Sequence, residues 1–368
     1  MENNMEERKR PYRPITPGEI IKEELDARGW TQGDFAEITG KPLQAINEII
    51  AGKKIIIPET AILFSEAFGT SPEFWLNLES AYRLDLLYQE KHKSELVSRR
   101  AKLYSLAPVK ELIKRGWIKA SKSIDQLELE VCNFLGIPNL GAPITIGVNF
   151  RKSNTGIIDN PSLLSWVKKA EIEAKKISCA AFKLAKFKQA MKSLNVLSSN
   201  DDDTRCIPEK LRELGIRLVF VPHLPQTCVD GAAFWLDKTS PVIALSLRMD
   251  RVDNFWFTLM HELVHIMETS KDNVRFIDSN ITEPESEAEK GVNQVAGDLL
   301  ITSDSFTDFV NRTKPYFSRN AVISFAQELG IHPAIVVGRL QYEKLIPYTN
   351  LRNFISKVKP IFAGYIEQ

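Results

Sequence analysis

The hydrophobic pattern of this 368-residue chain switches from helical to strand-like spacing and back again, and this limits the folds open to the chain. From Pro17 to about residue 200, apolar residues recur every three or four positions, as in amphipathic helices. After the acidic triplet 201–203 come three short runs rich in β-branched and aromatic residues, at 216–222, 232–236 and 242–247. Helical spacing then returns at 253–267, 285–301, 319–329 and 334–342. The pattern predicts a multidomain chain with an all-α N-terminal part, a helical middle and an α+β C-terminal part.

The composition is that of an ordinary globular protein. The chain is 43% hydrophobic and 26% charged, and 48 Lys+Arg against 47 Asp+Glu give a net charge of +1. These values exclude a wholly disordered chain and a uniformly basic nucleic-acid binder. No apolar run approaches the roughly 18 residues of a membrane helix, so we expect a soluble cytoplasmic protein with no membrane partner. Four scattered cysteines argue against a disulfide framework and predict buried, reduced thiols.

Glycines divide the N-terminal part into short helical segments. Segments 18–28, 32–39, 43–51 and 59–68 have helical spacing and are followed by Gly29, Gly40, Gly52 and Gly69. A fifth helix is expected to begin after Ser71, with this serine as N-cap and Pro72 in the first turn. The spacing predicts a compact helical unit.

The second and third segments have the layout of a helix-turn-helix. Thr31 is placed to cap the first helix, Gly40 supplies the turn, and the expected inner faces comprise Phe35, Ala36, Ile38, Leu43, Ile46, Ile49 and Ile50. Gln44 and Asn47 then face outward, and their amides suit bidentate contacts with adenine in a major groove. The expected DNA-binding residues are Thr31, Gln32, Lys41, Gln44, Asn47, Lys53 and Lys54, with the lysines on phosphates. The same layout fits any small helical bundle, so the pattern alone leaves both interpretations open.

Residues 13–90 resemble a known family of regulators. The stretch from Arg13-Pro14-Ile15-Thr16 through both helix-turn-helix segments to Leu84-Asp85-Leu86 is similar to the HigA antitoxins, which are XRE-type helix-turn-helix proteins. The resemblance implies a lambda-repressor-like fold and a homodimer that binds operator DNA and represses its own operon. It also implies a partner toxin, and residues 55–90 are the expected dimer interface.

A second motif predicts a metal site. His261-Glu262-Leu263-Val264-His265 has HExxH spacing on an expected helix, and a spacing of four puts both imidazoles on one face. Two such histidines can share a zinc ion, while Glu262 can take a proton from the attacking water and return it to the leaving amine. Chance matches to HExxH are frequent, so the motif alone also fits a helix whose histidines only pack.

A catalytic zinc ion normally has a third protein ligand. Among the acidic residues that follow, Glu289 is the preferred candidate because Asn293 and Ala296 share its helix face, and Glu285 is the second choice. We therefore expect one zinc ion per chain, held by His261, His265 and Glu289.

Residues 205–346 resemble the ImmA/IrrE family of metallopeptidase-like domains. The resemblance rests on four stretches, namely 242–245, 257–265, 289–300 and 325–341. It implies a zincin-like domain in which His261, His265 and Glu289 bind zinc and Glu262 is the base. Val264 stands where the family commonly has glycine, which mildly crowds the helix without removing a catalytic role. His223 and His332 are additional imidazoles that fit either an oxyanion-stabilising role or simple packing.

These observations predict five segments. They are a flexible arm (1–16), the helix-turn-helix domain (17–90), a mainly helical connecting region (91–204), the ImmA/IrrE-like domain (205–346) and a C-terminal extension (347–368). Between Pro161 and Lys192 the connecting region has eight lysines and two glutamates, which fit phosphate contacts, a solvated helix face or oligomerisation.

Two functions remain open from the sequence. The first is an antitoxin-type DNA-binding autorepressor that carries a zinc endopeptidase for a regulatory or toxin protein. The second is a non-catalytic repressor whose C-terminal domain senses a ligand or partner. The presence of Glu262 favours the first, because a domain without catalysis has no need of the base.

Overall fold

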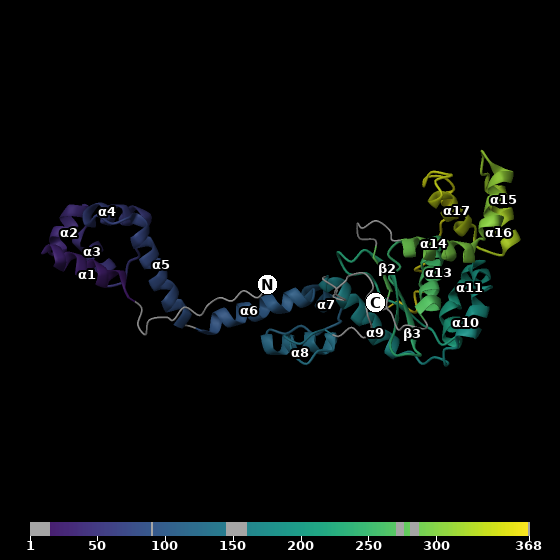
Figure 1. Ribbon diagram of the computed structural model, residues 1–368, viewed down its shortest axis with the longest axis horizontal. Coiled ribbons are helices and arrows are strands. Elements are labelled where there is room, and N and C mark those ends of the chain that lie inside the picture. Colours follow the sequence, from purple (N-terminus) through teal and green to yellow (C-terminus); the bar gives the residue numbers. More distant parts are fainter. Residues whose placement is uncertain (1–14, 90, 145–159, 270–275, 280–286, 367–368) are drawn as a thin grey trace. The chain divides into compact units, whose positions relative to one another are not determined.

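A computed structural model describes residues 15–89, 91–144, 160–269, 276–279 and 287–366 (Figure 1). Most of the expected flexible arm lies outside the described residues, and so does Glu285. By its contacts the chain divides into two compact units, Met1–Arg100 and Ala101–Gln368, and each is described by itself. The segment boundaries expected after residues 16, 90, 204 and 346 stay predictions.

The described residues of the first unit are mainly helical. The elements are α1 (Pro17–Arg28), α2 (Gln32–Thr39), α3 (Leu43–Ile50), α4 (Pro58–Phe68), α5 (Pro72–Gln89) and the beginning of α6 (Lys91–Leu106). Gly40 follows α2 with a φ of 66°, a left-handed conformation in which glycine has no steric penalty. The segments expected from the sequence match the first four helices to within one residue at each end.

An aromatic cluster forms the core of the first unit. The ring of Phe35 on α2 stacks on Phe68 of α4 with centroids 4.6 Å apart, and Trp75 of α5 packs edge-on against Phe64. Helices α1 and α3 approach so closely that a Cβ at Gly18 would lie 2.0 Å from the Ile50 carbonyl oxygen. Only glycine fits at this crossing.

Two of the expected core residues of the helix-turn-helix are exposed instead. Ile38 and Leu43 have exposed fractions of 49% and 48%, whereas Thr39 is buried. Phe35 and Ala36 define the buried side of α2, and position 39 lies midway between them around the helix axis. Ile38 lies away from this buried side. Leu43 is the first residue of α3, at the exposed N-terminal end of this helix.

A four-stranded mixed sheet forms the centre of the second unit. Its strands are β1 (Arg217–Phe220), β2 (Val229–Trp235), β3 (Pro241–Leu245) and β4 (Phe276–Ser279), in the spatial order β1-β3-β2-β4. Strand β1 runs parallel to β3, while β2 is antiparallel to both β3 and β4. The first three strands match the runs expected from the sequence, and β4 was not expected.

Helices cover both faces of this sheet. One set of alternate strand residues, which includes Leu218, Ile243 and Trp235, packs with α10 (Leu184–Met191), α12 (Ile207–Glu213) and α13 (Val252–Thr269). The intervening residues, which include Val219, Val242 and Phe234, pack with α7 (Val109–Lys114), α8 (Ile124–Leu135) and α9 (Pro161–Lys175). This division follows from the two-residue period of a strand. Helices of the expected connecting region thus form one layer of the sheet domain.

The remaining helices lie on the α13 side of the sheet. They are α11 (Asp201–Arg205), α14 (Glu287–Leu300), α15 (Ser303–Thr313), α16 (Arg319–Leu329) and α17 (Pro333–Tyr342), with short 3₁₀ turns at Leu194–Ser198 and Arg352–Phe354. The expected fold class, an all-α helix-turn-helix part and an α+β part, is confirmed. Within the described residues no single helix is long and apolar enough to cross a membrane. Helices α16 and α17, which are bent by 113° relative to each other, are together long and apolar enough by length and composition alone.

The lysines of the middle region do not form one solvated face. Lys168 and Lys169 are each 8% exposed, and they pair with Glu171 at 3.1 Å and Glu173 at 2.8 Å. The other six lysines between 161 and 192 are exposed. Buried, paired lysines serve the packing of α9. Of the exposed six, Lys176 also pairs with Glu173, at 2.7 Å.

The cysteines are all free thiols, as expected, but three of the four are not buried. Cys132 of α8 is buried, Cys179 is half-buried, and Cys206 and Cys228 are exposed. Both exposed cysteines lie in connections, one between α11 and α12 and one just before β2, where apolar side chains need not face a core.

Candidate functional site

Helix α13 carries the HExxH motif inside the second unit. Leu259, Leu263 and Val264 are fully buried in the core between the sheet and the helices α14 and α17. His261 and His265 have exposed fractions of 2% and 1%. A chance motif on a solvated helix face is therefore excluded.

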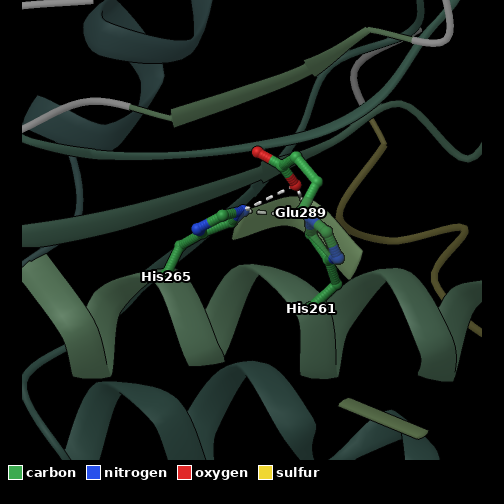
Figure 2. A group of neighbouring side chains, drawn as sticks. All are labelled: His261, His265 and Glu289. Atoms are coloured by element: carbon green, nitrogen blue, oxygen red, sulfur yellow. Dashed lines mark hydrogen bonds and ion pairs between the residues drawn. The ribbon is translucent and has the colours of Figure 1, made fainter. Parts of the chain in front are cut away.

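The side chains of His261, His265 and Glu289 converge (Figure 2). The two histidine Nε2 atoms are 2.9 Å apart, and Oε2 of Glu289 lies 3.5 Å from Nε2 of His261 and 3.7 Å from Nε2 of His265. Four ligand atoms about 2.1 Å from a zinc ion in a tetrahedron are separated by about 3.4 Å. The three atoms match such a face closely, and two histidines with one glutamate form a donor set of catalytic zinc sites.

This group stands alone in the part of the chain that the structure describes. There it is the one set of three or more His, Cys, Asp or Glu residues whose ligand atoms lie within 4.8 Å of one another. The other acidic candidate that the structure describes, Glu287, has a 90% exposed side chain and pairs with Lys290 at 2.7 Å. Glu289 is thus the glutamate that α14 directs to the histidines.

Asn293 lies one turn after Glu289 on α14 and contacts the first histidine. Its Oδ1 atom is 2.8 Å from Nδ1 of His261. An oxygen acceptor at this place keeps the proton on Nδ1, so that the lone pair of Nε2 points to the converging atoms. From the sequence, Asn293 marked only a helix face shared with Glu289. Its position four residues after the glutamate is the sequence signal for this supporting role.

Glu262 lies beneath strand β2. A Cβ at Gly231 would lie 2.7 Å from Oε1 of Glu262 and 2.8 Å from Cγ2 of Thr258, so the strand passes this point only as glycine. The pairing of β2 with β4 also shifts register between Val229 and Gly231, and such bulges often adjoin active sites. Glu262, which lies between the two histidines in the sequence, is fully buried. The role of Gly231 was not foreseen, because it depends on a strand from elsewhere in the chain.

The two additional histidines lie outside the ligand group. His332 is the N-cap of α17, and its Nδ1 accepts a hydrogen bond of 3.0 Å from the backbone N–H of Ala334. Burial lowers the pKa of His332 below its usual range, and the attraction of Asp201 and Asp253 opposes this lowering only in part. Burial also lowers the pKa of His223, with Arg115 acting in the same direction. His332 therefore fits the packing interpretation.

Helices α2 and α3 of the first unit form the expected helix-turn-helix. Thr31 caps α2, since its hydroxyl accepts from the N–H of Asp34 at 3.1 Å while Oδ2 of Asp34 accepts from the N–H of Thr31 at 2.7 Å. The hydrogen bonds that the backbone N–H and the hydroxyl of Thr31 donate to the Asp34 carboxylate hold the pKa of this carboxyl below its usual value. The Thr31 hydroxyl, which was also expected to contact DNA, is thus engaged in the cap.

The exposed face of α3 carries two amides. Gln44 and Asn47 are exposed, and Nε2 of Gln44 donates to Oε1 of Glu48 at 3.0 Å. Lys53 and Lys54 are exposed in the turn that follows, where their N–H groups donate to the Glu48 carbonyl oxygen. Gln32 and Lys41 are half-buried at the beginning of α2 and just before α3. All seven residues assigned to DNA lie on or beside these two helices.

Comparisons with known proteins agree with both parts of the chain. A helix-turn-helix family model matches residues 21–75, and a model of the IrrE N-terminal-like domain matches residues 211–341. Antitoxin HigA-1 of Vibrio cholerae is 37% identical over 78 residues, which cover 21% of this chain and 73% of the antitoxin. The chain belongs to the HigA family. An uncharacterized HTH-type transcriptional regulator of Escherichia coli is 37% identical over 68 residues, which are 18% of this chain and 72% of that protein.

The likeness to HigA proteins covers about a fifth of this chain. The antitoxin HigA of Pseudomonas aeruginosa, solved with the higBA promoter, is 32% identical over 22% of this chain and 90% of that chain, with a TM-score of 0.22. The second unit of this HigA-family chain holds the IrrE N-terminal-like domain, in which all members of the histidine and glutamate group lie. Both resemblances expected from the sequence are confirmed.

Proposed function

We propose that this chain is a DNA-binding, HigA-like regulator whose second unit carries a zinc-dependent endopeptidase centre. The convergence of His261, His265 and Glu289 on α13 and α14 is the observation that carries the proposal. Residues of this kind at these distances suit one zinc ion. The substrate class is a regulatory or toxin protein, in keeping with a relative named as an antitoxin.

The residues of the chain have distinct roles in this proposal. His261, His265 and Glu289 hold the ion, which when bound polarises a substrate carbonyl and makes water a better nucleophile. Oδ1 of Asn293 accepts a hydrogen bond from the Nδ1–H of His261 and so fixes the ring. Glu262 takes the proton from the attacking water and passes it to the nitrogen of the leaving amine. Burial of Glu262 keeps its carboxylate from being solvated by bulk water.

Substitution of Glu262 by Gln tests the peptidase role. The amide has the shape of the carboxylate but cannot accept the proton, so we expect cleavage to fall by about 10²–10⁴-fold. Zinc content, measured by elemental analysis, should stay the same, because Glu262 is outside the ligand group. Cleavage is measured on a fluorogenic peptide library.

The control for this substitution is Glu268→Gln. Glu268 is exposed and belongs to the same helix, so the variant makes the same chemical change away from the site. Undiminished cleavage by Glu262→Gln would remove the base role and favour the alternative function, a repressor whose second unit senses a ligand or partner without cutting.

For the first unit we infer binding to operator DNA through α3. The exposed amides of Gln44 and Asn47 support this inference, and exposed Lys53 and Lys54 supply positive charge for phosphates. Gln44→Ala and Asn47→Ala should each weaken binding to DNA from upstream of the chain's own gene by about 1–3 kcal/mol per lost bidentate pair. Gel-shift titrations on that DNA and on random DNA make the measurement, with Gln189→Ala of the second unit as control. An equal loss on both DNAs would contradict base reading.

We also infer a homodimer. Residues 55–90 leave several large apolar side chains exposed, namely Ile55, Ile57, Ile62, Leu63, Phe74, Leu84, Leu86 and Leu87. Exposed apolar surface of this extent is typical of an association face, and a two-fold dimer matches paired operator half-sites. Sedimentation equilibrium gives the mass directly, and a monomer at micromolar concentration would contradict the inference.

A further inference from the structure

A pocket of about 470 Å³ lies next to the metal-ligand group, between the helices α13, α14 and α17. Asn293 is part of its wall, whereas none of His261, Glu262, His265 and Glu289 lines it. The volume falls in the range of about 300–1,000 Å³ that is usual for small-molecule sites. The pocket is therefore large enough for a ligand of its own, separate from a peptide at the histidines.

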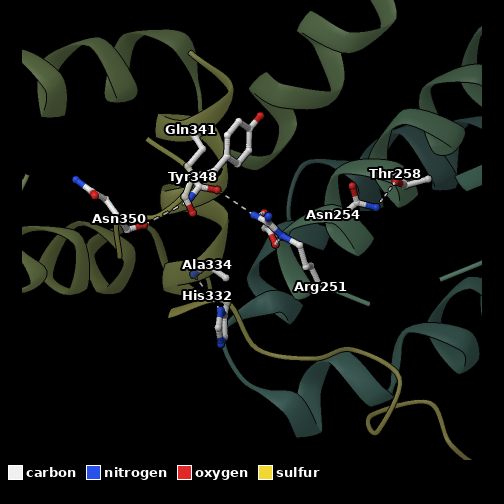
Figure 3. A network of polar contacts seen from close by, with 9 residues as sticks. Arg251, Asn254, Thr258, His332, Ala334, Gln341, Tyr348 and Asn350 are labelled. Atoms are coloured by element: carbon white, nitrogen blue, oxygen red, sulfur yellow. Dashed lines mark hydrogen bonds and ion pairs between the residues drawn. The ribbon is translucent and has the colours of Figure 1, made fainter. Parts of the chain in front are cut away.

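Hydrogen bonds hold the walls of this pocket in place. Arg251 donates to Asp253 at 3.0 and 2.6 Å and to Oε1 of Gln341 at 3.0 Å. Gln341, which is 1% exposed, donates in turn to the carbonyl oxygen of Asn350 at 3.3 Å. Figure 3 shows this chain of contacts from Arg251 through Gln341 to the loop of Tyr348 and Asn350. Such a frame makes the pocket preformed, which reduces the cost of binding.

The lining of the pocket indicates the chemistry of its ligand. Leu300, Ile301 and Ile335 give an apolar floor, and the rings of Phe257, Tyr342 and Tyr348 offer flat faces. The amides of Asn254, Asn293 and Gln294 are nearby donors and acceptors.

The charges of the lining limit the charge of the ligand. Three basic side chains, Arg251, Lys290 and Arg339, stand against two acidic ones, Asp253 and Glu343. Arg339 already donates to the carbonyl oxygens of Gly297 and Ile301, and Arg251 is bound to Asp253. Guanidiniums engaged in this way leave little for a polyphosphate, so a neutral or singly anionic ligand fits best.

Two residues of the wall also touch the first histidine. Oδ1 of Asn293 is 2.8 Å from Nδ1 of His261, and the ring of Phe257 has its centroid 6.3 Å from that of His261. A ligand that moves either residue changes the orientation of His261. Changes to a residue that hydrogen-bonds to a metal ligand typically alter metal affinity about 10–100-fold.

We propose that this pocket binds a flat, mostly apolar, neutral or singly anionic aromatic molecule, and that its binding changes the zinc affinity of the neighbouring site through Asn293 and Phe257. The pocket makes the second unit a sensor of such molecules. Binding itself does not depend on the proposed peptidase activity, whereas the coupling depends on the proposed zinc site.

The first experiment fills the pocket. Gly297 of α14 lines it, and a Cβ there would lie 3.6 Å from Arg339 Nη1, which leaves room for a side chain that then occupies the pocket. Gly291 belongs to the same helix but its Cβ would meet nothing within 4 Å. Both glycine-to-leucine changes raise helix propensity, so only the position differs.

The probe is 8-anilinonaphthalene-1-sulfonate, an aromatic monoanion with a flat naphthalene ring, titrated into the full chain and followed by its fluorescence. We expect Gly297→Leu to weaken its binding about tenfold or more, and Gly291→Leu to leave it unchanged. If Gly297→Leu does not fold, Gln294→Trp at the exposed mouth serves instead, with Val295→Trp as its matched control. Equal probe affinity in each variant and its control would overturn the proposal.

The second experiment measures the coupling. Zinc affinity is determined by competition with a chelator, with and without the probe, and probe affinity with and without zinc. The two ratios must be equal by thermodynamic linkage, and we expect them to differ from one in the wild type and to approach one in Asn293→Ala. A ratio of one in zinc-loaded wild type overturns the coupling. A wild type that binds no zinc contradicts the proposed function instead, and the fluorescence comparison still decides on the pocket.

Discussion

Single residues set the geometry of the metal-ligand group, and some were visible in the sequence. His261 and His265 follow from helix spacing alone, because residues four apart share a face on any helix. Glu289 was selected among several glutamates by the same periodicity, and the structure brings it to the histidines. Gly231 could not be found in this way. Its importance depends on the strand that passes over Glu262, a contact between distant parts of the chain.

Gly231→Ala should damage the site from the side of the sheet. The added methyl group would lie 2.7 Å from Oε1 of Glu262, so the strand or the carboxylate has to move. Overpacking of this kind costs about 1–3 kcal/mol. We expect the free energy of unfolding, measured by urea unfolding, to fall by that amount. The control Gly291→Ala adds the same methyl group in open space on α14. A stability equal to that of the wild type for Gly231→Ala would contradict the close approach.

At the scale of elements, local chemistry determined most of what could be predicted. Caps and breakers marked the helices of the first unit, where Thr31 and Gly40 stand at the two ends of α2. Strand β4 was missed because its four residues, Phe276–Ser279, are too few to show a period and gain their place only by pairing with β2.

Helix α17 gives a prediction about pH. His332 accepts from the N–H of Ala334 only while its Nδ1 is unprotonated. Its folded pKa lies below the ordinary value of 6.5, so the unfolded chain takes up the proton first as pH falls. The stabilisation is thus complete above about pH 6.5 and declines as pH drops toward the folded pKa.

His332→Asn keeps a capping acceptor but does not titrate, so part of the pH dependence of stability should disappear. His332→Ala, which lacks the acceptor, should lose about 1 kcal/mol at pH 8. Urea unfolding between about pH 8 and pH 5.5 makes the measurement. Identical pH profiles for the wild type and His332→Asn would show that the cap does not titrate.

At the scale of the whole molecule, the sequence indicated the fold classes but not the partner of each buried face. Continuous burial of Pro241–Leu245 is what a strand between two layers requires, and the apolar run at this place predicted it. Hydrophobic period shows that a face is buried but not which element covers it. For this reason the role of α7, α8 and α9 as a layer on the sheet emerged only from the structure.

The two units also separate the two proposed activities. The helix-turn-helix lies wholly in the first unit and the metal-ligand group wholly in the second. Each unit has hydrophobic clusters of its own, so loss of the metal ligands should leave operator binding by α3 intact.

The most direct test of this account is the metal content of the full chain and of its His261→Ala/His265→Ala variant, purified without chelators and measured by elemental analysis. The convergence of His261, His265 and Glu289 predicts one zinc ion per chain in the wild type and none in the variant. An absence of metal from the wild type, or equal metal in both proteins, would contradict the zinc centre.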